Sequence, residues 1–157
     1  MASHKISTPK GFTLIEVLVV LGMFALVGAC SLVIGMESYQ SGSLIDDQAS
    51  LVSALQKARS EAMSAVCVGS ACTGGVPHGV HITAKQLIIF QGAVYNPNDE
   101  NNDYISLQDA ALAVSGLSDV MFAEYSGDSS APGDVVMSDA SGCIATTSIG
   151  AEGQILW

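Results

Sequence analysis

Two cysteines and two histidines lie in one short stretch, and their side chains are those that most readily bind metal or form a disulfide. Their order is Cys67, Cys72, His78 and His81, a C-x4-C-x5-H-x2-H pattern. As a set they depart from the usual C-x2–4-C and H-x3–5-H spacing of structural zinc sites. If this part of the chain is exported, Cys67 and Cys72 are the natural disulfide pair; otherwise they are free thiols on a surface loop. We expect the disulfide and no metal site.

The same thiols and imidazoles do not predict catalysis. A cysteine nucleophile needs a base within hydrogen-bonding distance, and closeness in sequence does not supply that geometry. His81 lies between Val80 and Ile82, so strand alternation predicts that it faces solvent. Of the other cysteines, Cys30 lies inside an apolar run and Cys143 is left without an expected partner. We predict no catalytic residue and no cofactor.

Residues 96–103 (NPNDENND) are rich in oxygen-bearing side chains, the ligand type that calcium prefers. The segment lacks the glycine at position six and the bidentate glutamate at position twelve of an EF-hand loop. Asn, Asp and Pro also favour turns. We expect a solvated polar loop, with calcium binding as the alternative. The oxygen donors are Asn96, Asn98, Asp99, Glu100, Asn102 and Asp103.

Glu16 is the one acidic residue at the start of a long apolar run. Residues 17–36 contain no charged side chain, and as a helix they would be about 30 Å long, the thickness of a bilayer's hydrocarbon core. A carboxylate at the centre of such a helix costs about 2.5–3.5 kcal/mol, and less near an interface. Glu16 therefore needs a partner, or else its carboxylate reaches the headgroups.

The charges on either side of the apolar run predict its orientation. Lys5 and Lys10 precede it, whereas Glu37, Asp46 and Asp47 follow it. By the positive-inside rule the N-terminus stays in the cytoplasm and the acidic part is exported. A cleaved secretory signal is the alternative, but its apolar core would be only about 7–15 residues long.

The composition excludes two classes of protein. The chain has 157 residues, of which 49% are apolar and 13% charged, so it is not intrinsically disordered as a whole. Fifteen acids against five Lys and Arg give a net charge of -10. Beyond the apolar run the only cations are Lys57, Arg59 and Lys85, so no basic patch for nucleic acid is expected.

The segment KGFTLIE at residues 10–16, followed by the apolar run, resembles the class III signal of type IV prepilins and type II secretion pseudopilins. The resemblance implies that prepilin peptidase cuts between Gly11 and Phe12, and that the new Phe12 amine is methylated. It also implies that Glu16 contacts the Phe12 amine of a neighbouring subunit, while the apolar helices bundle into a filament core. Such a cation would neutralise Glu16 in a low-dielectric bundle.

A second, shorter resemblance concerns residues 58–63 (ARSEAM), 79–82 (GVHI) and 87–90 (LIIF). They are similar to the helix and first hairpin of the GspH/FimT branch of minor pilins and pseudopilins. The two resemblances together cover roughly residues 1–92.

Hydrophobic patterning predicts an α+β fold. Residues 37–66 contain no proline, and apolar side chains recur at helical spacing from Leu44 to Val66. We expect a leader at 1–11, a transmembrane helix at 12–36, its extension at 37–66, and an exported β-rich part at 67–157. The second half of the helix should pack on an antiparallel sheet. Strands are expected at residues 80–83, 87–90, 93–95, 111–114, 120–124, 134–138, 143–149 and 154–157, with a hairpin turn at 84–86.

These features favour a structural protein over an enzyme. The expected function is that of a minor pilin or pseudopilin, first held in the inner membrane by one span with its N-terminus inside. It would then enter a filament at the cell surface or in the periplasm. The expected partners are other subunits of this kind, prepilin peptidase and the membrane. A type II secretion pseudopilin and a DNA-uptake minor pilin at a filament tip are the alternatives.

Overall fold

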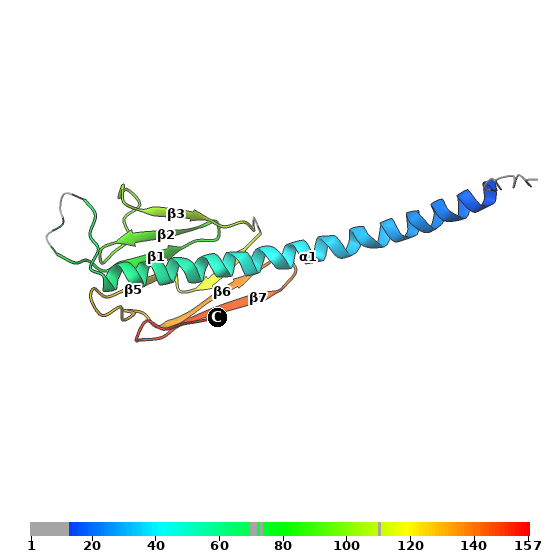
Figure 1. Cartoon of the computed structure of the whole chain (residues 1–157). Coiled ribbons are helices and arrows are strands. Elements are labelled where there is room, and N and C mark those ends of the chain that lie inside the picture. The colour runs from blue at the N-terminus through cyan, green and yellow to red at the C-terminus, as the bar shows by residue number, and fades with distance from the viewer. Residues whose placement is uncertain (1–12, 70–71, 73, 110) are drawn as a thin grey trace, which may run out of the picture. The chain divides into compact units, whose positions relative to one another are not determined.

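The computed structural model describes residues 13–69, 72, 74–109 and 111–157, and of residues 30–42 the backbone alone. The chain divides into two compact units, Met1–Ser38 and Tyr39–Trp157. Helix α1 (Leu14–Met63) contributes to both, and every strand belongs to the second (Figure 1). The predicted α+β class, a long N-terminal helix followed by antiparallel strands, is confirmed.

The C-terminal end of α1 is a Schellman motif without a glycine. The Val66 N–H donates to the Glu61 carbonyl and the Ala65 N–H donates to the Ala62 carbonyl, each at 3.0 Å. Ala65 occupies the left-handed region with φ at 51°. The helix therefore ends at Met63, three residues before the expected end.

The strands form two four-stranded antiparallel sheets rather than the single sheet that the sequence led us to expect. Sheet 1 has the order β3-β2-β1-β5, and sheet 2 has the order β4-β6-β7-β8. The chain passes from sheet 1 to sheet 2 at β4 and returns at β5. The bounds are β1 His78–Ile82, β2 Gln86–Gln91, β3 Asp103–Ser106, β4 Ala113–Gly116, β5 Asp119–Phe122, β6 Gly133–Ser138, β7 Ile144–Ile149 and β8 Ile155–Leu156.

The hydrophobic core lies where the C-terminal part of α1 crosses both sheets (Figure 1). The helix contributes fully buried leucines and, where the backbones approach closely, alanines. Each buried Leu contributes about 1.5–3 kcal/mol relative to an exposed one. The core side chains include Leu51, Leu55, Ala58 and Ala62 from α1, Val80, Leu87, Val120 and Phe122 from sheet 1, and Val135 and Met137 from sheet 2.

One predicted strand is absent and one strand was missed. Residues 93–95 form no strand. Tyr95 instead lies in the loop after β2 and stacks on the ring of His81 in strand β1 of sheet 1. Strand β3 was missed because Asp103 looked like the end of a polar loop, yet residues 103–106 pair with β2 from Ile89 to Gln86. The β1–β2 hairpin was predicted correctly, with Ile82 opposite Leu87.

Candidate functional site

Glu16, the residue to which the family resemblance assigns a role in assembly, lies in the first turn of α1. Thr13 caps the helix, because its Oγ1 accepts a hydrogen bond from the Glu16 N–H at 3.3 Å. Residues 13–16 thus follow the T-x-x-E pattern of a capping box, in which serine or threonine precedes glutamate by three positions. An acidic side chain here also interacts favourably with the helix dipole. The cap therefore fixes Glu16 in the first turn of α1, four residues after Phe12 in the sequence.

The surface around Glu16 is almost wholly apolar. A hollow of about 330 Å³ is lined by Glu16 together with Val17, Val20, Leu21 and Phe24. Phe24 is 71% exposed, and the large apolar side chains on every side of this helix are exposed as well. An apolar helix surface of this kind is stable only when lipid or other helices cover it.

Two of the predicted site residues, Gly11 and Phe12, lie outside the described residues. The expected transmembrane segment 12–36 also runs past Ala29 into residues whose side chains are not described. Within the part of the chain that the structure describes, no helix is long and apolar enough to cross a membrane.

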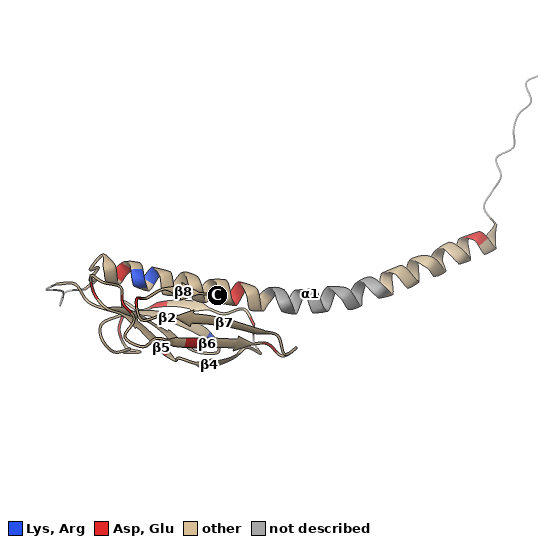
Figure 2. Ribbon diagram, turned by 90° about the horizontal axis from the view of Figure 1, so that it is seen from below, with Lys and Arg blue, Asp and Glu red and all other residues tan. Residues whose placement is uncertain are grey.

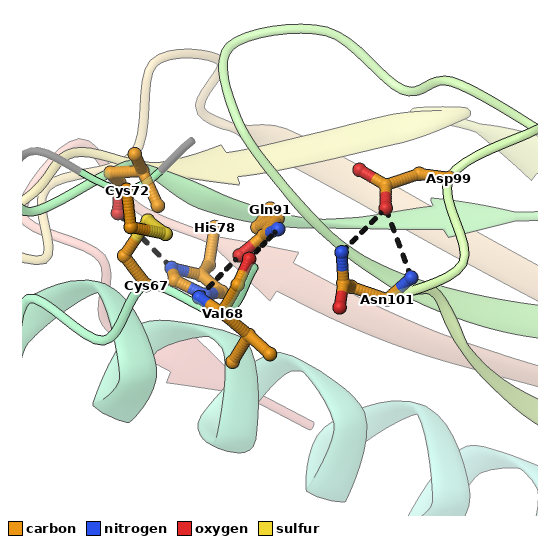
Figure 3. Close-up of a disulfide and its surroundings, with 8 residues drawn as sticks. Cys67, Val68, Cys72, His78, Gln91, Asp99 and Asn101 are labelled. Carbon is orange, nitrogen blue, oxygen red and sulfur yellow. Dashed lines mark hydrogen bonds between the residues drawn. A yellow bond between two sulfur atoms is a disulfide. The ribbon is translucent and has the colours of Figure 1, made fainter. Parts of the chain in front are cut away.

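The predicted Cys67–Cys72 disulfide is present, with its Cα atoms 5.8 Å apart (Figure 3). Gln91 of β2 fixes the loop that it closes, because the Gln91 side-chain amide bonds both backbone groups of Val68. The Val68 N–H donates to Gln91 Oε1 at 3.0 Å, and Gln91 Nε2 donates to the Val68 carbonyl at 2.7 Å. The sequence indicated the disulfide but not the glutamine that positions it.

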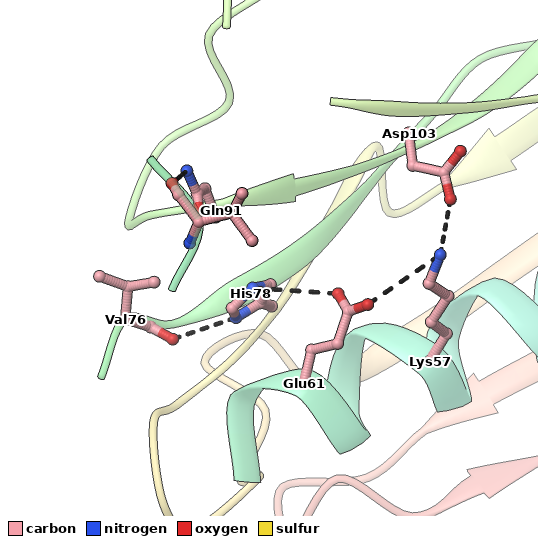
Figure 4. A network of polar contacts seen from close by, with 7 residues as sticks. Lys57, Glu61, Val76, His78, Gln91 and Asp103 are labelled. Carbon is pink, nitrogen blue, oxygen red and sulfur yellow. Dashed lines mark hydrogen bonds and ion pairs between the residues drawn. The ribbon is translucent and has the colours of Figure 1, made fainter. Parts of the chain in front are cut away.

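A polar network links α1 to sheet 1 beside this loop (Figure 4). Lys57 Nζ donates to Asp103 Oδ2 at 2.6 Å and lies 4.0 Å from Glu61 Oε1. His78 is buried; its Nδ1 donates to the Val76 carbonyl at 3.1 Å, and its Nε2 lies 3.9 Å from Glu61 Oε2. The hydrogen bond with Asp103 raises the pKa of Lys57 above its ordinary value. The network neutralises Lys57 and fastens the helix to the sheet.

The zinc set considered from the sequence is not assembled. Cys67 and Cys72 are bonded to each other, so neither offers a thiolate. His78 faces α1, whereas His81 lies on the opposite face of β1. In the described ranges no three His, Cys, Asp or Glu side chains are placed to hold a metal ion.

His81 is half-buried, which corrects the prediction that it faces solvent. It does lie on the face of sheet 1 away from α1, but the loop after β2 covers that face. The Tyr95 ring stacks on the His81 ring with centroids 4.2 Å apart, and His81 Nδ1 lies 2.7 Å from Asp119 Oδ1. Desolvation, followed by the neighbouring Tyr104, raises the pKa of Tyr95. These contacts hold the loop on the sheet.

The oxygen-rich loop 96–103 uses several of its oxygens in its own turns. Asn96 Oδ1 accepts from the Asn98 N–H at 3.0 Å, and Asp99 Oδ1 accepts from the Asn101 N–H at 2.9 Å. Asp103 pairs with Lys57. Turns with these Asx contacts match the expected polar loop; calcium binding stays an untested alternative.

Cys143 is exposed and forms no disulfide, as the sequence led us to expect. Cys143 ends the turn between β6 and β7, and Asp139 holds this turn together. Asp139 Oδ1 accepts a hydrogen bond from the Ser141 hydroxyl at 2.6 Å and another from the Cys143 N–H at 2.9 Å. These hydrogen bonds, led by that from Ser141, lower the pKa of Asp139.

Two anchoring residues on α1 escaped the sequence analysis. Asp47 is buried, and its carboxylate accepts from the Gln108 N–H at 2.8 Å and the Asp109 N–H at 3.0 Å. Arg59 donates from Nε to the Gly127 carbonyl at 3.2 Å and from Nη2 to the Glu152 carbonyl at 2.9 Å. All four partner groups are backbone atoms distant in sequence, so no side-chain pattern could have revealed them.

Comparison with known families finds a match at the N-terminal end of the chain. Residues 7–29 match the family model for the prokaryotic N-terminal methylation motif, which supports a type IV pilin-like precursor. The match includes both sides of the expected cleavage site, the Thr13 cap and Glu16. Neither a curated protein nor a solved structure matches the chain significantly.

Proposed function

We propose that this chain is a minor pilin or pseudopilin, a structural subunit of a type IV pilus-like filament. The observation that carries the proposal is the methylation motif at residues 7–29, in which Glu16 follows the capped start of α1. In this proposal prepilin peptidase cuts between Gly11 and Phe12, and the new Phe12 amine is methylated. Proteins with this motif are structural, so no enzymatic activity is assigned.

The exposed apolar surface of the first half of α1 supports membrane storage followed by assembly. Before assembly, lipid covers the side chains from Leu14 to Val27; in the filament, neighbouring helices replace the lipid. Glu16 is the exception to this surface, and the Phe12 amine of another subunit is the cation proposed to neutralise it. Residues 39–157 then lie on the exported side of the membrane, where the Cys67–Cys72 disulfide is stable.

The order of elements, in which the β1–β2 hairpin is the first element after α1, supports the GspH/FimT branch as the finer assignment. Within that branch the DNA-uptake alternative has little support. Of the three cations in the exported part, Lys57 is paired with Asp103 and Arg59 points to two carbonyls on the other flank of the helix. Three dispersed cations in a chain of net charge -10 do not form a phosphate-binding surface.

The test of the proposal is the N-terminus of the mature protein. Intact-mass and N-terminal peptide analysis of the chain, made in a host with prepilin peptidase, should find a start at Phe12 with one added methyl group. The same host without the peptidase should yield the uncut chain. A mature start beyond Met36 would identify an ordinary signal peptide and end the proposal. If processing is as proposed, loss of pili or of enzyme secretion on deleting the gene decides between the pilus and the type II secretion filament.

A further inference from the structure

A groove of about 620 Å³ opens between the last turns of α1 and strand β8. Figure 2 shows β8 beside this part of α1, where the basic residues of the helix are drawn blue. The volume lies within the range of about 300–1,000 Å³ that is usual for small-molecule sites. Among the described residues no acid lines the groove, although the chain has 15 acids against 5 Lys and Arg. An anion can therefore approach this acidic protein here.

Arg59 is held in the groove by one edge of its guanidinium. Its Nε donates to the Gly127 carbonyl at 3.2 Å and its Nη2 donates to the Glu152 carbonyl at 2.9 Å. A guanidinium is planar and has five N–H donors, so the other edge, formed by Nη1 and the second N–H of Nη2, is left for a bidentate carboxylate. No carboxylate of the described residues lies within ion-pair distance of Arg59. The two carbonyls orient the guanidinium without neutralising its charge.

Two glycines allow the turns on either side to approach Arg59. Gly127 and Gly153 both have positive φ, at 71° and 70°. A Cβ would lie 3.2 Å from Arg59 Nε if added to Gly127, and 2.8 Å if added to Gly153. A side chain at either position would crowd the guanidinium. The backbone of two turns far apart in sequence thus gives the free edge of Arg59 a defined place in the groove.

The rest of the lining suits a ligand that carries many hydroxyl groups. Amide and hydroxyl side chains both donate and accept hydrogen bonds, as sugar hydroxyls do. Trp157 is 69% exposed and offers an indole ring, a large apolar surface on which the C–H face of a sugar ring can pack. An acidic peptide would satisfy Arg59 alone, whereas a saccharide also uses the uncharged polar groups. These groups belong to Gln56, Ser60, Ser64 and Gln154.

We propose that the groove between α1 and β8 binds a saccharide that carries a carboxylate, such as an oligomer of hexuronic acid. The carboxylate binds the free edge of Arg59, a sugar ring packs on Trp157, and the hydroxyls form hydrogen bonds with the amide and hydroxyl side chains. This binding site goes beyond the role of a filament subunit. It does not depend on that role, because all of its residues lie in the unit Tyr39–Trp157, outside the methylation motif.

Trp157 is the one tryptophan of the chain, so its fluorescence reports directly on the groove. The full chain, in a detergent without a sugar headgroup, is titrated with trimers of galacturonate, glucuronate and mannuronate and with their methyl esters. At least one trimer should change the fluorescence with a Kd below about 1 mM. Its ester, which has the same rings without the charge, should bind about tenfold more weakly or worse. No saturable change with any trimer, or equal binding of the esters, would overturn the proposal.

Charge variants of α1 provide the matched control. Gln56→Glu places a carboxylate three residues before Arg59, where it competes for the free edge while the two carbonyl contacts of Arg59 remain. It should weaken binding of the trimer about fivefold. Ala49→Glu adds the same charge at an exposed position about 10 Å earlier along the helix axis and should leave the Kd unchanged. Equal Kd values for the two variants would contradict the role of Arg59.

Triglutamate distinguishes a saccharide from an acidic peptide. It carries the carboxylates but no sugar ring, so it should bind at least tenfold more weakly than the best trimer. If triglutamate bound as tightly as that trimer, the groove would recognise acidic protein segments, and the saccharide proposal would be wrong.

Discussion

Lys57 and Asp103 are separated by 46 residues of sequence, yet their charged atoms lie 2.6 Å apart. The contact connects the last turns of α1 to the first residue of β3. It explains why a segment that begins as a polar loop continues as a strand, because the aspartate is fixed at the point where pairing with β2 starts.

Replacing Lys57 by methionine should lower the free energy of unfolding by about 0.2–1 kcal/mol, since both side chains are half exposed. The hydrogen bond with Asp103 raises the pKa of Lys57 above 10.5. The contribution of this ion pair to the free energy of unfolding is therefore fully present below pH 10.5, and it is lost as the pH rises through the raised pKa. Denaturant unfolding of both proteins at about pH 8 and about pH 12 measures this. Lys85→Met, at an exposed lysine, is the control. If wild type and Lys57→Met differed in unfolding free energy by the same amount at both pH values, the Lys57–Asp103 ion pair would not be the cause of the difference.

Asp47→Asn should cost about 1–3 kcal/mol of stability. The carboxylate accepts two backbone N–H groups, whereas an amide offers one oxygen and turns its NH2 toward the other donor. The neighbouring Asp46 is exposed, and Asp46→Asn should change stability by less than about 0.5 kcal/mol. Thermal unfolding measures both variants. Equal unfolding midpoints for Asp47→Asn and Asp46→Asn would disprove the anchoring role of Asp47.

Ala65→Gly should stabilise the protein by about 1 kcal/mol. Ala65 has a positive φ of 51°, a conformation that costs an alanine roughly 1–2 kcal/mol and a glycine little. The same substitution at Ala49, exposed in the middle of α1, should destabilise by about 1 kcal/mol. Opposite shifts in melting temperature are the expected result, and a decrease in both would show that the Ala65 side chain contributes more than its strain removes.

The double variant Cys67→Ser with Cys72→Ser should lose about 2 kcal/mol, the loop-closure contribution of a short disulfide loop. Gln91 still holds Val68 in this variant, so sheet 1 should remain folded. Denaturant titrations of the oxidised wild type and the variant give the difference. Identical midpoints would mean that the Gln91 contacts alone order the loop.

Glu16→Gln should leave membrane insertion and processing intact, since removing a charge lowers the insertion cost. Incorporation into filaments should fall, because the proposed pairing with the Phe12 amine needs the carboxylate. Quantification of the subunit in sheared filament fractions tests this, with Asp46→Asn as a charge-matched control outside the apolar segment. Normal incorporation of Glu16→Gln would rule out the pairing.

Local sequence patterns predicted the elements that depend on local physics. The absence of proline and the spacing from Leu44 to Val66 predicted the helix, and two apolar runs predicted the β1–β2 hairpin. The Cys67–Cys72 disulfide was predicted because this part of the chain was expected to be exported to an oxidising compartment, where the short loop between the two thiols can close. In each case the partners lie close together in the chain, so their spacing carries the information.

The features that the sequence did not predict depend on contacts between segments that are distant in the chain. Asp47 and Arg59 bind backbone groups 61 to 93 residues away, and backbone groups leave no signature in a sequence. The division into two sheets follows from β4 pairing with β6 while β5 pairs with β1, which strand propensity does not determine. The predicted face of His81 is correct, but its exposure was mispredicted, because Tyr95 from the loop after β2 stacks on its ring.

Because the chain exchanges between the sheets at β4 and β5, one edge of β1 is paired by a strand from much later in the sequence. Strands β2 and β3 follow β1 in the chain, whereas β5, which pairs with the other edge of β1, begins 37 residues after β1 ends. An open strand edge is a template for wrong pairing. A chain truncated before residue 119 would therefore keep that edge of β1 unpaired.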